Sequence, residues 1–364
     1  MKIVDVEARI FAVPPRRKET EVPWVFGRLA QVFVEVTTDD GLVGIGEAYG
    51  YGVPKASAAV VNETLRPLLV GEDARRIAQL TQRMFQKTHL FGRYGVTTFA
   101  ISGVETALWD LAGKRAGQPL YQLLGGAAGT RVPAYASLVR YPEEHEQIRL
   151  DAQKAMAEGF TMLKVHQITV PSVAMAREVI GEDVPLTVDI NCEWSPFEAA
   201  RMAEAMHEYE LFWLEEPVWP PEDYVGLAQV QASTGVPLSS GENACTAHQF
   251  KAMMDVGAVT YLQPSVTKVG GIAEWLNVAR LVQLNGFELA PHSPYFGPGL
   301  VATLHLIAHT GQGRWIEKIY FDLEVELFKE PLQLAGGVYT VPDGPGLGVE
   351  LNWEALAAFE VADG

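Results

Sequence analysis

The sequence predicts an α/β fold in which an N-terminal α+β region precedes a barrel of alternating parallel strands and helices. From Arg131 onward, short apolar runs alternate with helical stretches at intervals of about 25 residues, which is typical of βα units and a parallel sheet. About eight such units follow one another, the number that closes a barrel. Ahead of Arg131, apolar residues first alternate singly and then repeat with a helical period.

The N-terminal region begins with three expected strands. Residues 2–12 and 30–37 have the composition of strands, and in the second Val32, Val34 and Val36 fall on one face. An Asp-Asp-Gly turn then leads into a third strand, LVGIGEA. The pattern predicts an antiparallel meander.

Two loops and a helical stretch complete this region. The loop at 14–28 is long and charged, and the loop at 48–54 carries Tyr-Gly-Tyr-Gly. Each either covers a site or is a plain surface connection. Helical patterning runs from 57 to 118, and within 101–126 the pair Gly125-Gly126 is expected to end the helix.

The barrel strands are expected at eight places. They are 132–138, 161–166, 185–191, 211–216, 237–243, 259–265, 287–292 and 313–317. We expect an α+β domain at 1–128, a barrel at 129–328 that carries the chemistry, and a segment at 329–364 that packs back on the first domain.

Three successive barrel strands each end in a carboxylate: Asp189, Glu215 and Glu242. The carboxyl ends of barrel strands are where such folds place their active sites. Acids near strand ends are common on polar surfaces, but three in register after apolar strands favour a binding site. Three oxygen ligands suit a hard divalent cation, with Mg²⁺ as the default.

Other polar residues end the remaining strands. Lys164 and His166 alternate on one strand and therefore point into the barrel together. His292 ends a strand well separated around the ring, so a substrate on the metal could meet a base on each face. A barrel histidine is otherwise often a packed structural residue, an interpretation that fits His305 and His309.

This geometry suggests an acid–base reaction on a carboxylate substrate. A divalent cation acidifies the proton α to the carboxylate, and a histidine removes it. Lys164 would add positive charge beside the same oxygens, and Glu317, if protonated, would donate a hydrogen bond to them. Either Lys164 or His166 could be the base. Substrate contacts are expected from Asn191, Ser265, Trp24 and Tyr295.

The composition of the chain disfavours several classes of binding partner and location. The 364 residues carry a formal net charge of −17, which disfavours a nucleic-acid partner. There are two cysteines and no CxxC, so no disulfide framework or zinc ribbon is expected. No run is long enough for a membrane span, and the N-terminus lacks the apolar core of a signal peptide, so a cytoplasmic location is expected.

Several motifs together resemble the enolase superfamily, specifically its mandelate racemase-like subgroup. They are GVETALWDLAGK at 103–114, Asp189-Ile-Asn191, Leu214-Glu-Glu-Pro217, Gly241-Glu-Asn243, Lys268-Val-Gly-Gly271, His292, Trp315-Ile-Glu317 and PDGPGLG at 342–348. The resemblance covers nearly the whole chain. It implies a modified (β/α)₇β TIM-type barrel with an α+β capping domain whose two loops close over substrate. It also implies Mg²⁺ at the three carboxylates, abstraction of a proton α to a carboxylate, and a homo-oligomer.

The chain departs from the racemase pattern at two positions. His166 stands where the second lysine of Lys-x-Lys is usual, and Ser265 stands where an aspartate would pair with His292. Without that carboxylate, His292 is expected to be a weaker base and less firmly oriented. A lysine at 265 would mark the muconate-lactonizing subgroup, so Ser265 also disfavours that subgroup.

One good base and one acid suit dehydration better than two matched bases. The leading hypothesis is therefore a Mg²⁺-dependent dehydratase that converts a sugar acid to a 2-keto-3-deoxy acid. An isomerase remains the first alternative: a racemase, an epimerase, or a cycloisomerase of a lactone or anhydro sugar acid. A barrel that binds metal or ligand without catalysis is the second.

Overall fold

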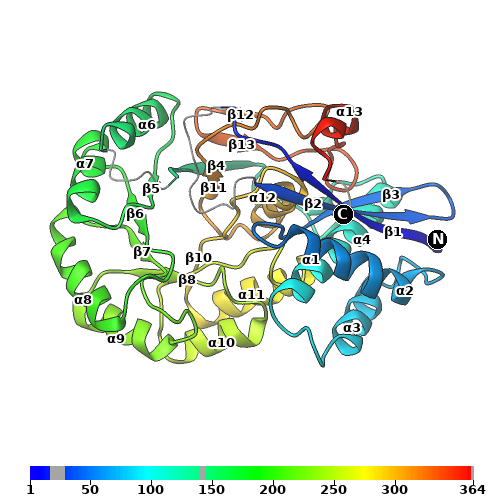
Figure 1. Cartoon of the computed structure of the whole chain (residues 1–364), viewed down its shortest axis with the longest axis horizontal. Coiled ribbons are helices and arrows are strands. Elements are labelled where there is room, and N and C mark those ends of the chain that lie inside the picture. Colours follow the sequence, from blue (N-terminus) through cyan, green and yellow to red (C-terminus); the bar gives the residue numbers. More distant parts are fainter. Residues whose placement is uncertain (17–28, 140–144, 362–364) are drawn as a thin grey trace.

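The computed structural model describes residues 1–16, 29–139 and 145–361. Trp24, expected to contact substrate, lies outside these residues. Figure 1 shows two parts, a ring of strands and helices on one side and a smaller group of strands and helices on the other. Among the described residues, no helix has both the length and the apolar composition needed to cross a bilayer.

The predicted antiparallel meander is confirmed in the N-terminal part. Its strands are β1 (Ile3–Ala12), β2 (Ala30–Thr38) and β3 (Val43–Ala48), in that order in the sheet. Val32, Val34 and Val36 are fully buried against the helices of this part, whereas Phe33 packs into the core of the barrel. The sheet is therefore covered on both faces, and the capping part rests directly on the barrel.

Helices cover the meander. They are α1 (Pro54–Ala59), a π-helical turn (Val60–Leu65), α2 (Arg66–Leu69), α3 (Ile77–Lys87), α4 (Val96–Ala116) and α5 (Leu120–Leu123). The expected helix end at Gly125-Gly126 is wrong. Helix α4 stops at Ala116 because Gly117 adopts a left-handed conformation, with φ of 65°, and caps it.

Eight strands form the barrel wall, each at a predicted place. They are β4 (Arg131–Ser137), β5 (Leu163–Val165), β6 (Leu186–Asp189), β7 (Trp213–Glu215), β8 (Leu238–Ser240), β9 (Tyr261–Leu262), β10 (Glu288–Leu289) and β11 (Ile316–Ile319). The ladders run in chain order from β4 to β10, and β11 pairs with β4, all in parallel.

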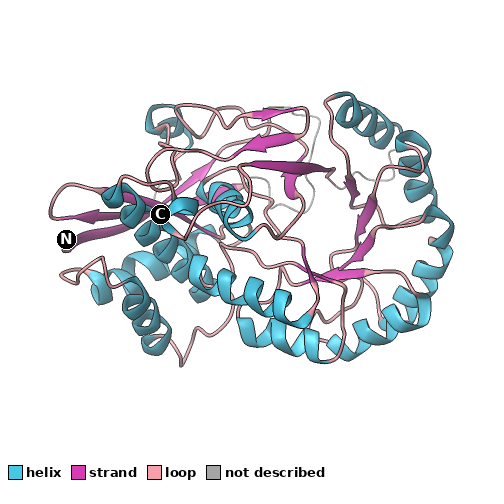
Figure 2. Cartoon of the chain, turned by 180° about the vertical axis from the view of Figure 1, so that it is seen from behind, coloured by secondary structure: helices cyan, strands magenta, loops and turns pink. Residues whose placement is uncertain are grey.

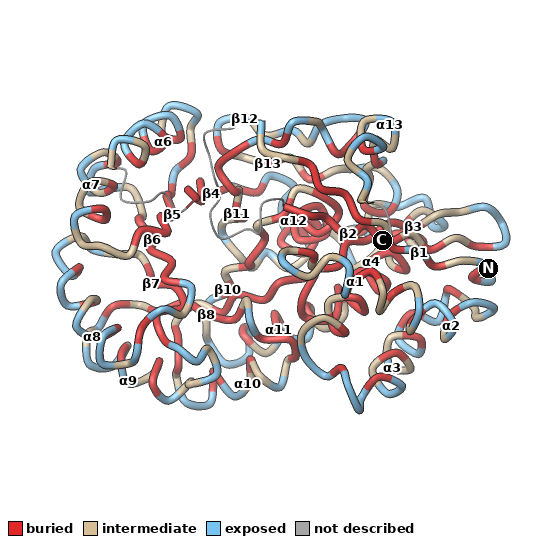
Figure 3. The backbone as a smooth tube through the Cα atoms, viewed as in Figure 1, coloured by how far each residue is buried: buried red, intermediate tan, exposed pale blue. Residues whose placement is uncertain are grey.

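Each of the first seven barrel strands is followed by a helix, and β11 has none in the part of the chain that the structure describes. The helices are α6 (His145–Ala157), α7 (Val170–Ile180), α8 (Pro196–Ala205), α9 (Tyr224–Thr234), α10 (Ala247–Asp255), α11 (Ile272–Asn285) and α12 (Pro298–Thr310), with a 3₁₀ turn (His207–Tyr209) after α8. The fold is therefore a modified (β/α)₇β barrel with a capping part. Figure 2 shows these helices outside the strands, and Figure 3 shows buried residues along the strands and mixed burial along the outer helices.

The barrel strands are shorter than the predicted runs, and their ends decide where the functional side chains lie. Asp189 and Glu215 are the last residues of β6 and β7. Strand β8 stops at Ser240, because Gly241 turns the backbone with φ of 136°. Glu242 therefore projects from a loop just beyond its strand.

The C-terminal segment touches both parts of the molecule. Strands β12 (Leu334–Ala335) and β13 (Val338–Thr340) form a hairpin, and β13 pairs antiparallel with β4. Further along, helix α13 (Trp353–Leu356) and a 3₁₀ turn (Ala357–Phe359) precede a salt bridge of 2.8 Å between Arg9 and Glu360. The predicted domain boundaries themselves stay a prediction.

Candidate active site

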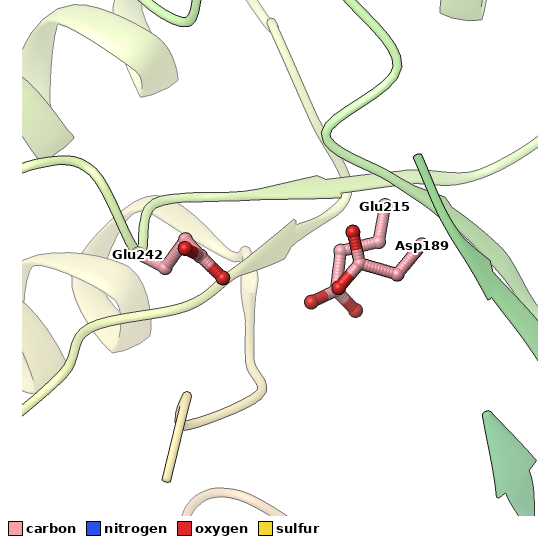
Figure 4. Close-up of side chains that lie close together, drawn as sticks. All are labelled: Asp189, Glu215 and Glu242. Atoms are coloured by element: carbon pink, nitrogen blue, oxygen red, sulfur yellow. The ribbon is translucent and has the colours of Figure 1, made fainter. Parts of the chain in front are cut away.

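Three carboxylates gather at the carboxyl ends of neighbouring strands. One ligand atom from each of Asp189, Glu215 and Glu242 lies within 4.8 Å of the others. Figure 4 shows Asp189 and Glu215 side by side, with Glu242 extending toward them. Asp189 and Glu215 sit opposite each other in the β6–β7 ladder and are almost fully buried. Trp213 fixes Glu215 further by donating its indole N–H to Oε2 at 2.9 Å.

Lys164 stands beside this cluster and is buried with it. Its Nζ lies 3.2 Å from Asp189 Oδ2, 2.9 Å from Glu215 Oε1 and 2.8 Å from Glu317 Oε1. Burial alone would lower the pKa of Lys164, but Glu215 and Glu317 outweigh it and hold the pKa well above its usual value. A lysine held protonated by three acids is suited to stabilising negative charge rather than to accepting a proton.

His166 points into the barrel beside Lys164, as the alternation predicted. Its Nδ1 lies 2.5 Å from the carbonyl oxygen of Leu138, so Nδ1 carries the hydrogen and donates it there. Its Nε2 then faces Asp189 Oδ2 at 3.2 Å and the cavity. A backbone carbonyl that fixes the tautomer leaves Nε2 as the proton acceptor, which is the arrangement a general base needs.

His292 approaches from the far side of the carboxylates. Its Nε2 lies 2.9 Å from Glu242 Oε2, and its Nδ1 lies 3.2 Å from Ser265 Oγ. The hydroxyl of Tyr295 contacts Ser265 and lies 3.5 Å from the same Nδ1. Both ring nitrogens therefore have partners, and a pair of hydroxyls occupies the place where the racemase pattern has a carboxylate.

The remaining predicted residues divide into two groups. Asn191 lines the cavity, and its backbone N–H donates to Asp189 Oδ1 at 2.9 Å. Ser265 and Tyr295 lie behind His292 and are nearly fully buried. This placement favours a role in holding His292, and their predicted substrate contact stays a prediction.

Charge in the site favours ionised acids at three positions. Burial opposes ionisation of Asp189 and Glu317, but the charge of Lys164 lowers the pKa of both. For Glu242, the charges of His292 and Lys268 outweigh burial and lower the pKa to about 2. Glu317 is thus an ion-pair acceptor here, and the structure gives no support to the expectation that it is protonated and donates a hydrogen bond.

Two residues to which the sequence reasoning gave no role also belong to the site. Lys268 Nζ lies 3.6 Å from Glu242 Oε1 and 4.8 Å from the centroid of the Tyr49 ring. Tyr51 packs against Tyr49, with ring centroids 5.3 Å apart, and donates its hydroxyl hydrogen to the Pro294 carbonyl at 2.6 Å. The Tyr-Gly-Tyr-Gly motif was the available signal, since both tyrosines belong to the loop expected to cover a site.

Many of these side chains line a cavity of about 570 Å³, counting space open to solvent. The three carboxylate ligands offer only oxygen, the donor that Mg²⁺ and similar hard cations prefer. Burial, together with the charges of Asp189 and Glu317, raises the pKa of Glu215 well above its usual value, and a bound cation would favour its ionised form. The residues present therefore fit a divalent cation, with His166 beside Asp189 and His292 beside Glu242.

Comparisons with known families match both parts of the chain. Residues 7–125 match the mandelate racemase / muconate lactonizing enzyme N-terminal domain, and residues 147–355 match the enolase C-terminal domain-like family.

Characterised relatives resemble the chain over most of its length. An arabinonate dehydratase of Saccharolobus solfataricus is 35% identical over 88% of this chain and 88% of its own. A 3,6-anhydro-alpha-L-galactonate cycloisomerase of Streptomyces coelicolor is 34% identical over 91% of each chain. Among solved structures, a racemase from Streptomyces coelicolor with bound magnesium superimposes with a TM-score of 0.89 at 31% identity, covering 99% of this chain and 100% of that one.

Proposed function

The chain belongs to the mandelate racemase / muconate lactonizing enzyme family of the enolase superfamily, and on that premise we propose that it is a Mg²⁺-dependent acid-sugar dehydratase. It removes the proton α to the carboxylate of a sugar acid, expels the β-hydroxyl as water and yields a 2-keto-3-deoxy acid. The dehydratase among its relatives supports the reaction class.

One observation carries the proposal. The three carboxylates of β6–β8 converge within 4.8 Å, with His166 on one side and His292 on the other. A substrate carboxylate held between them meets one nitrogen that accepts a proton and one that can donate a proton. Asp189, Glu215 and Glu242 would hold the cation, which supplies positive charge that acidifies the α-proton.

The first step takes place on the side of the cavity next to β5. Nε2 of His166 takes the α-proton from the substrate and becomes part of an imidazolium. Lys164 carries positive charge next to the carboxylate site and offsets the charge that develops on the substrate oxygens as the enolate forms. Lys164 is the alternative base, but three buried ion pairs keep it protonated.

The second step takes place on the side of the cavity next to β10. As the enolate electrons form the C2–C3 double bond, the β-hydroxyl leaves with a proton from His292 and becomes water. The enol then takes a proton at C3 and loses the proton of its C2 hydroxyl to solvent, which gives the keto acid. Ser265 and Tyr295 hold the His292 ring through Nδ1 so that Nε2 faces the cavity.

Product mass after incubation with Mg²⁺ and a panel of sugar acids, their lactones and simple 2-hydroxy acids tests this function. A dehydratase yields a keto acid that is one water lighter than its substrate. A product of unchanged mass would replace the dehydratase by an isomerase. If no acid gave a product or exchanged its α-proton, the result would favour a barrel that binds metal or ligand without catalysis.

A cycloisomerase is the second candidate function, and two relatives favour it. The Streptomyces coelicolor cycloisomerase is 34% identical, and a D-galactarolactone cycloisomerase of Agrobacterium fabrum is 32% identical. The same base and acid would then eliminate a ring oxygen instead of a hydroxyl. Opening of an anhydro or lactone ring without loss of mass distinguishes this reaction from dehydration.

Two expectations about the whole protein belong to the same proposal. We propose that the chain forms a homo-oligomer and acts in the cytoplasm. Light scattering on the purified protein tests the first, and fractionation of the source cells tests the second.

A further inference from the structure

The cavity has two chemically different sides. The ladders place β4 beside β11, and both lie across the barrel from β7, with β5 and β6 between them on one side. The three carboxylates end or follow β6, β7 and β8. The tops of β4 and β11 therefore face the end of a substrate that points away from the carboxylate cluster.

The residues that follow the strand ends show the difference between these sides. Beyond β5 and β6, the cavity is lined by His166 and Asn191, which are polar. Beyond β4, it is lined by Val139, which is apolar. The mouth of the barrel is therefore polar above β5 and β6 and turns apolar above β4.

The side chains along β11 show the same change from polar to apolar. Glu317 faces the carboxylate cluster. Ile319, the next residue on that face, and Phe321, in the turn that follows β11, line the cavity above it. Leu29, just ahead of β2, lines the same cavity from the capping part. Val139, Ile319, Phe321 and Leu29 are each at most 8% exposed.

Two polar side chains that line the cavity near this end already have partners. Ser137 donates to Glu317, and the hydroxyl of Tyr51 donates to the Pro294 carbonyl. Phe321 packs on Phe296, with ring centroids 5.2 Å apart, and so has a fixed position. Within the described part of the cavity, the apolar end thus offers little to hydrogen-bond a terminal hydroxyl.

We infer that the substrate is a deoxy sugar acid whose terminal carbon is a methyl group lying against Leu29, Val139, Ile319 and Phe321. The inference rests on the proposed function. Hydroxyls at C2 and C3 meet the polar side among His166, His292 and Asn191, and the far carbon meets the apolar side. A terminal hydroxyl there would lose its water without gaining a partner.

Paired acids test the inference. Each hexonic acid is compared with its 6-deoxy counterpart of the same configuration, in the presence of Mg²⁺ and for several configurations. The two quantities measured are kcat/KM and the loss of the α-proton in D₂O. We expect the 6-deoxy member to be preferred by about 10- to 100-fold, mostly through KM, because apolar pockets discriminate against an added hydroxyl to that extent. Equal rates, or a preference for the fully hydroxylated member, would overturn the inference.

A variant moves the preference in a known direction. Val139→Thr keeps the shape of the side chain and replaces one methyl by a hydroxyl at the apolar end, so the 6-deoxy preference should shrink by about tenfold. Val256→Thr makes the same change at a residue that is 44% exposed after α10, and it should leave the preference unaltered. A preference that is the same in both variants would contradict the inference.

The two proposals fail in different ways. If no acid of either type loses its α-proton, the proposed function fails and the inference falls with it. If acids lose the α-proton but the hydroxylated members are preferred, the function stands and only the inference is wrong. Calorimetric binding of each pair to His166→Asn gives the same comparison without turnover, and tighter binding of the hydroxylated acid would also overturn the inference.

Discussion

At the scale of single residues, the two departures from the racemase pattern define an asymmetric site. His166 has its tautomer fixed by a backbone carbonyl, and His292 has its Nδ1 held by the hydroxyls of Ser265 and Tyr295. The two histidines therefore have different hydrogen-bond partners. An asymmetric pair suits a reaction that takes a proton on one side and gives one on the other.

The first prediction separates these roles. His166→Asn should lower α-proton exchange and product formation together, by about 10²- to 10⁴-fold, because the general base is lost. His292→Asn should lower product formation by a similar factor but retain exchange. Proton NMR in D₂O measures both quantities in one sample. Full exchange by His166→Asn with Mg²⁺ bound would show that another residue is the base.

The second prediction concerns the hydroxyl that stands in for a carboxylate. Ser265→Ala removes one partner of His292 Nδ1, and a hydrogen bond of this kind contributes about 1 kcal/mol, so kcat should fall by about fivefold. Ser233→Ala is the matched control, since its hydroxyl lies on α9 and donates to a backbone carbonyl there. If Ser265→Ala left kcat unaltered, Ser265 would not position His292.

At the scale of elements, helix α4 joins the capping part to the barrel. The carboxylate of Glu105 accepts hydrogen bonds from the backbone N–H groups of Ile272 and Ala273 at the start of α11, at 2.7 and 3.1 Å, and from Trp109 Nε1 at 2.8 Å. Gly271 comes so close that a Cβ would lie 2.2 Å from this carboxylate. The carboxylate thus caps a barrel helix from the other part of the molecule.

The third prediction tests this cap. Glu105→Ala leaves several buried donors without an acceptor and should destabilise the chain by about 3 kcal/mol. Urea unfolding measures the change. Glu178→Ala, an exposed glutamate within α7, is the matched control and should cost little. Equal destabilisation by both variants would argue against the cap.

The fourth prediction concerns the structural histidine of α12. His305 is fully buried, donates from Nε2 to the Leu347 carbonyl at 3.1 Å and accepts at Nδ1 from the Tyr121 N–H. Burial lowers its pKa from 6.5 to about 4. The unfolded chain therefore binds the proton first, so the contribution of His305 is complete above pH 6.5 and is lost as pH falls toward 4. The loss amounts to about 3 kcal/mol.

Urea unfolding of His305→Gln across pH 4 to 7 checks this dependence. The variant should lose less stability than the wild type over that interval, whereas His207→Gln, at an exposed position, should follow the wild type. An acid dependence unchanged in His305→Gln would assign the loss to other groups.

Much of the element pattern could be predicted from the sequence. Periodicity placed all eight barrel strands, and the carboxylates at their ends were found without structural information. What escaped prediction depends on distant contacts. Ser265 and Tyr295 meet only because β9 and β10 are neighbours, and the end of α4 depends on one left-handed glycine. Lys268 was recognised only as part of a motif, and its place between Tyr49 and Glu242 depends on contacts between separate parts of the chain.

At the scale of the whole molecule, metal binding should be linked to folding. The three ligands come from successive strands, so the cation site forms only when the barrel is closed. As a fifth prediction, Mg²⁺ at 100 times its dissociation constant should raise the free energy of unfolding by about 2.7 kcal/mol. Thermal unfolding with and without Mg²⁺ measures the increment. Asp189→Asn should lose it, and an increment retained in that variant would place the metal elsewhere.

The central claim is α-proton abstraction at the carboxylate cluster, and proton NMR in D₂O tests it most directly. Sugar acids are followed with Mg²⁺, after EDTA, and after Mg²⁺ is restored. The account predicts that the α-proton signal disappears as 3-deoxy signals grow, that EDTA stops both, and that Mg²⁺ restores both. Turnover that continues unchanged in EDTA, or an α-proton that persists in every acid, would contradict it.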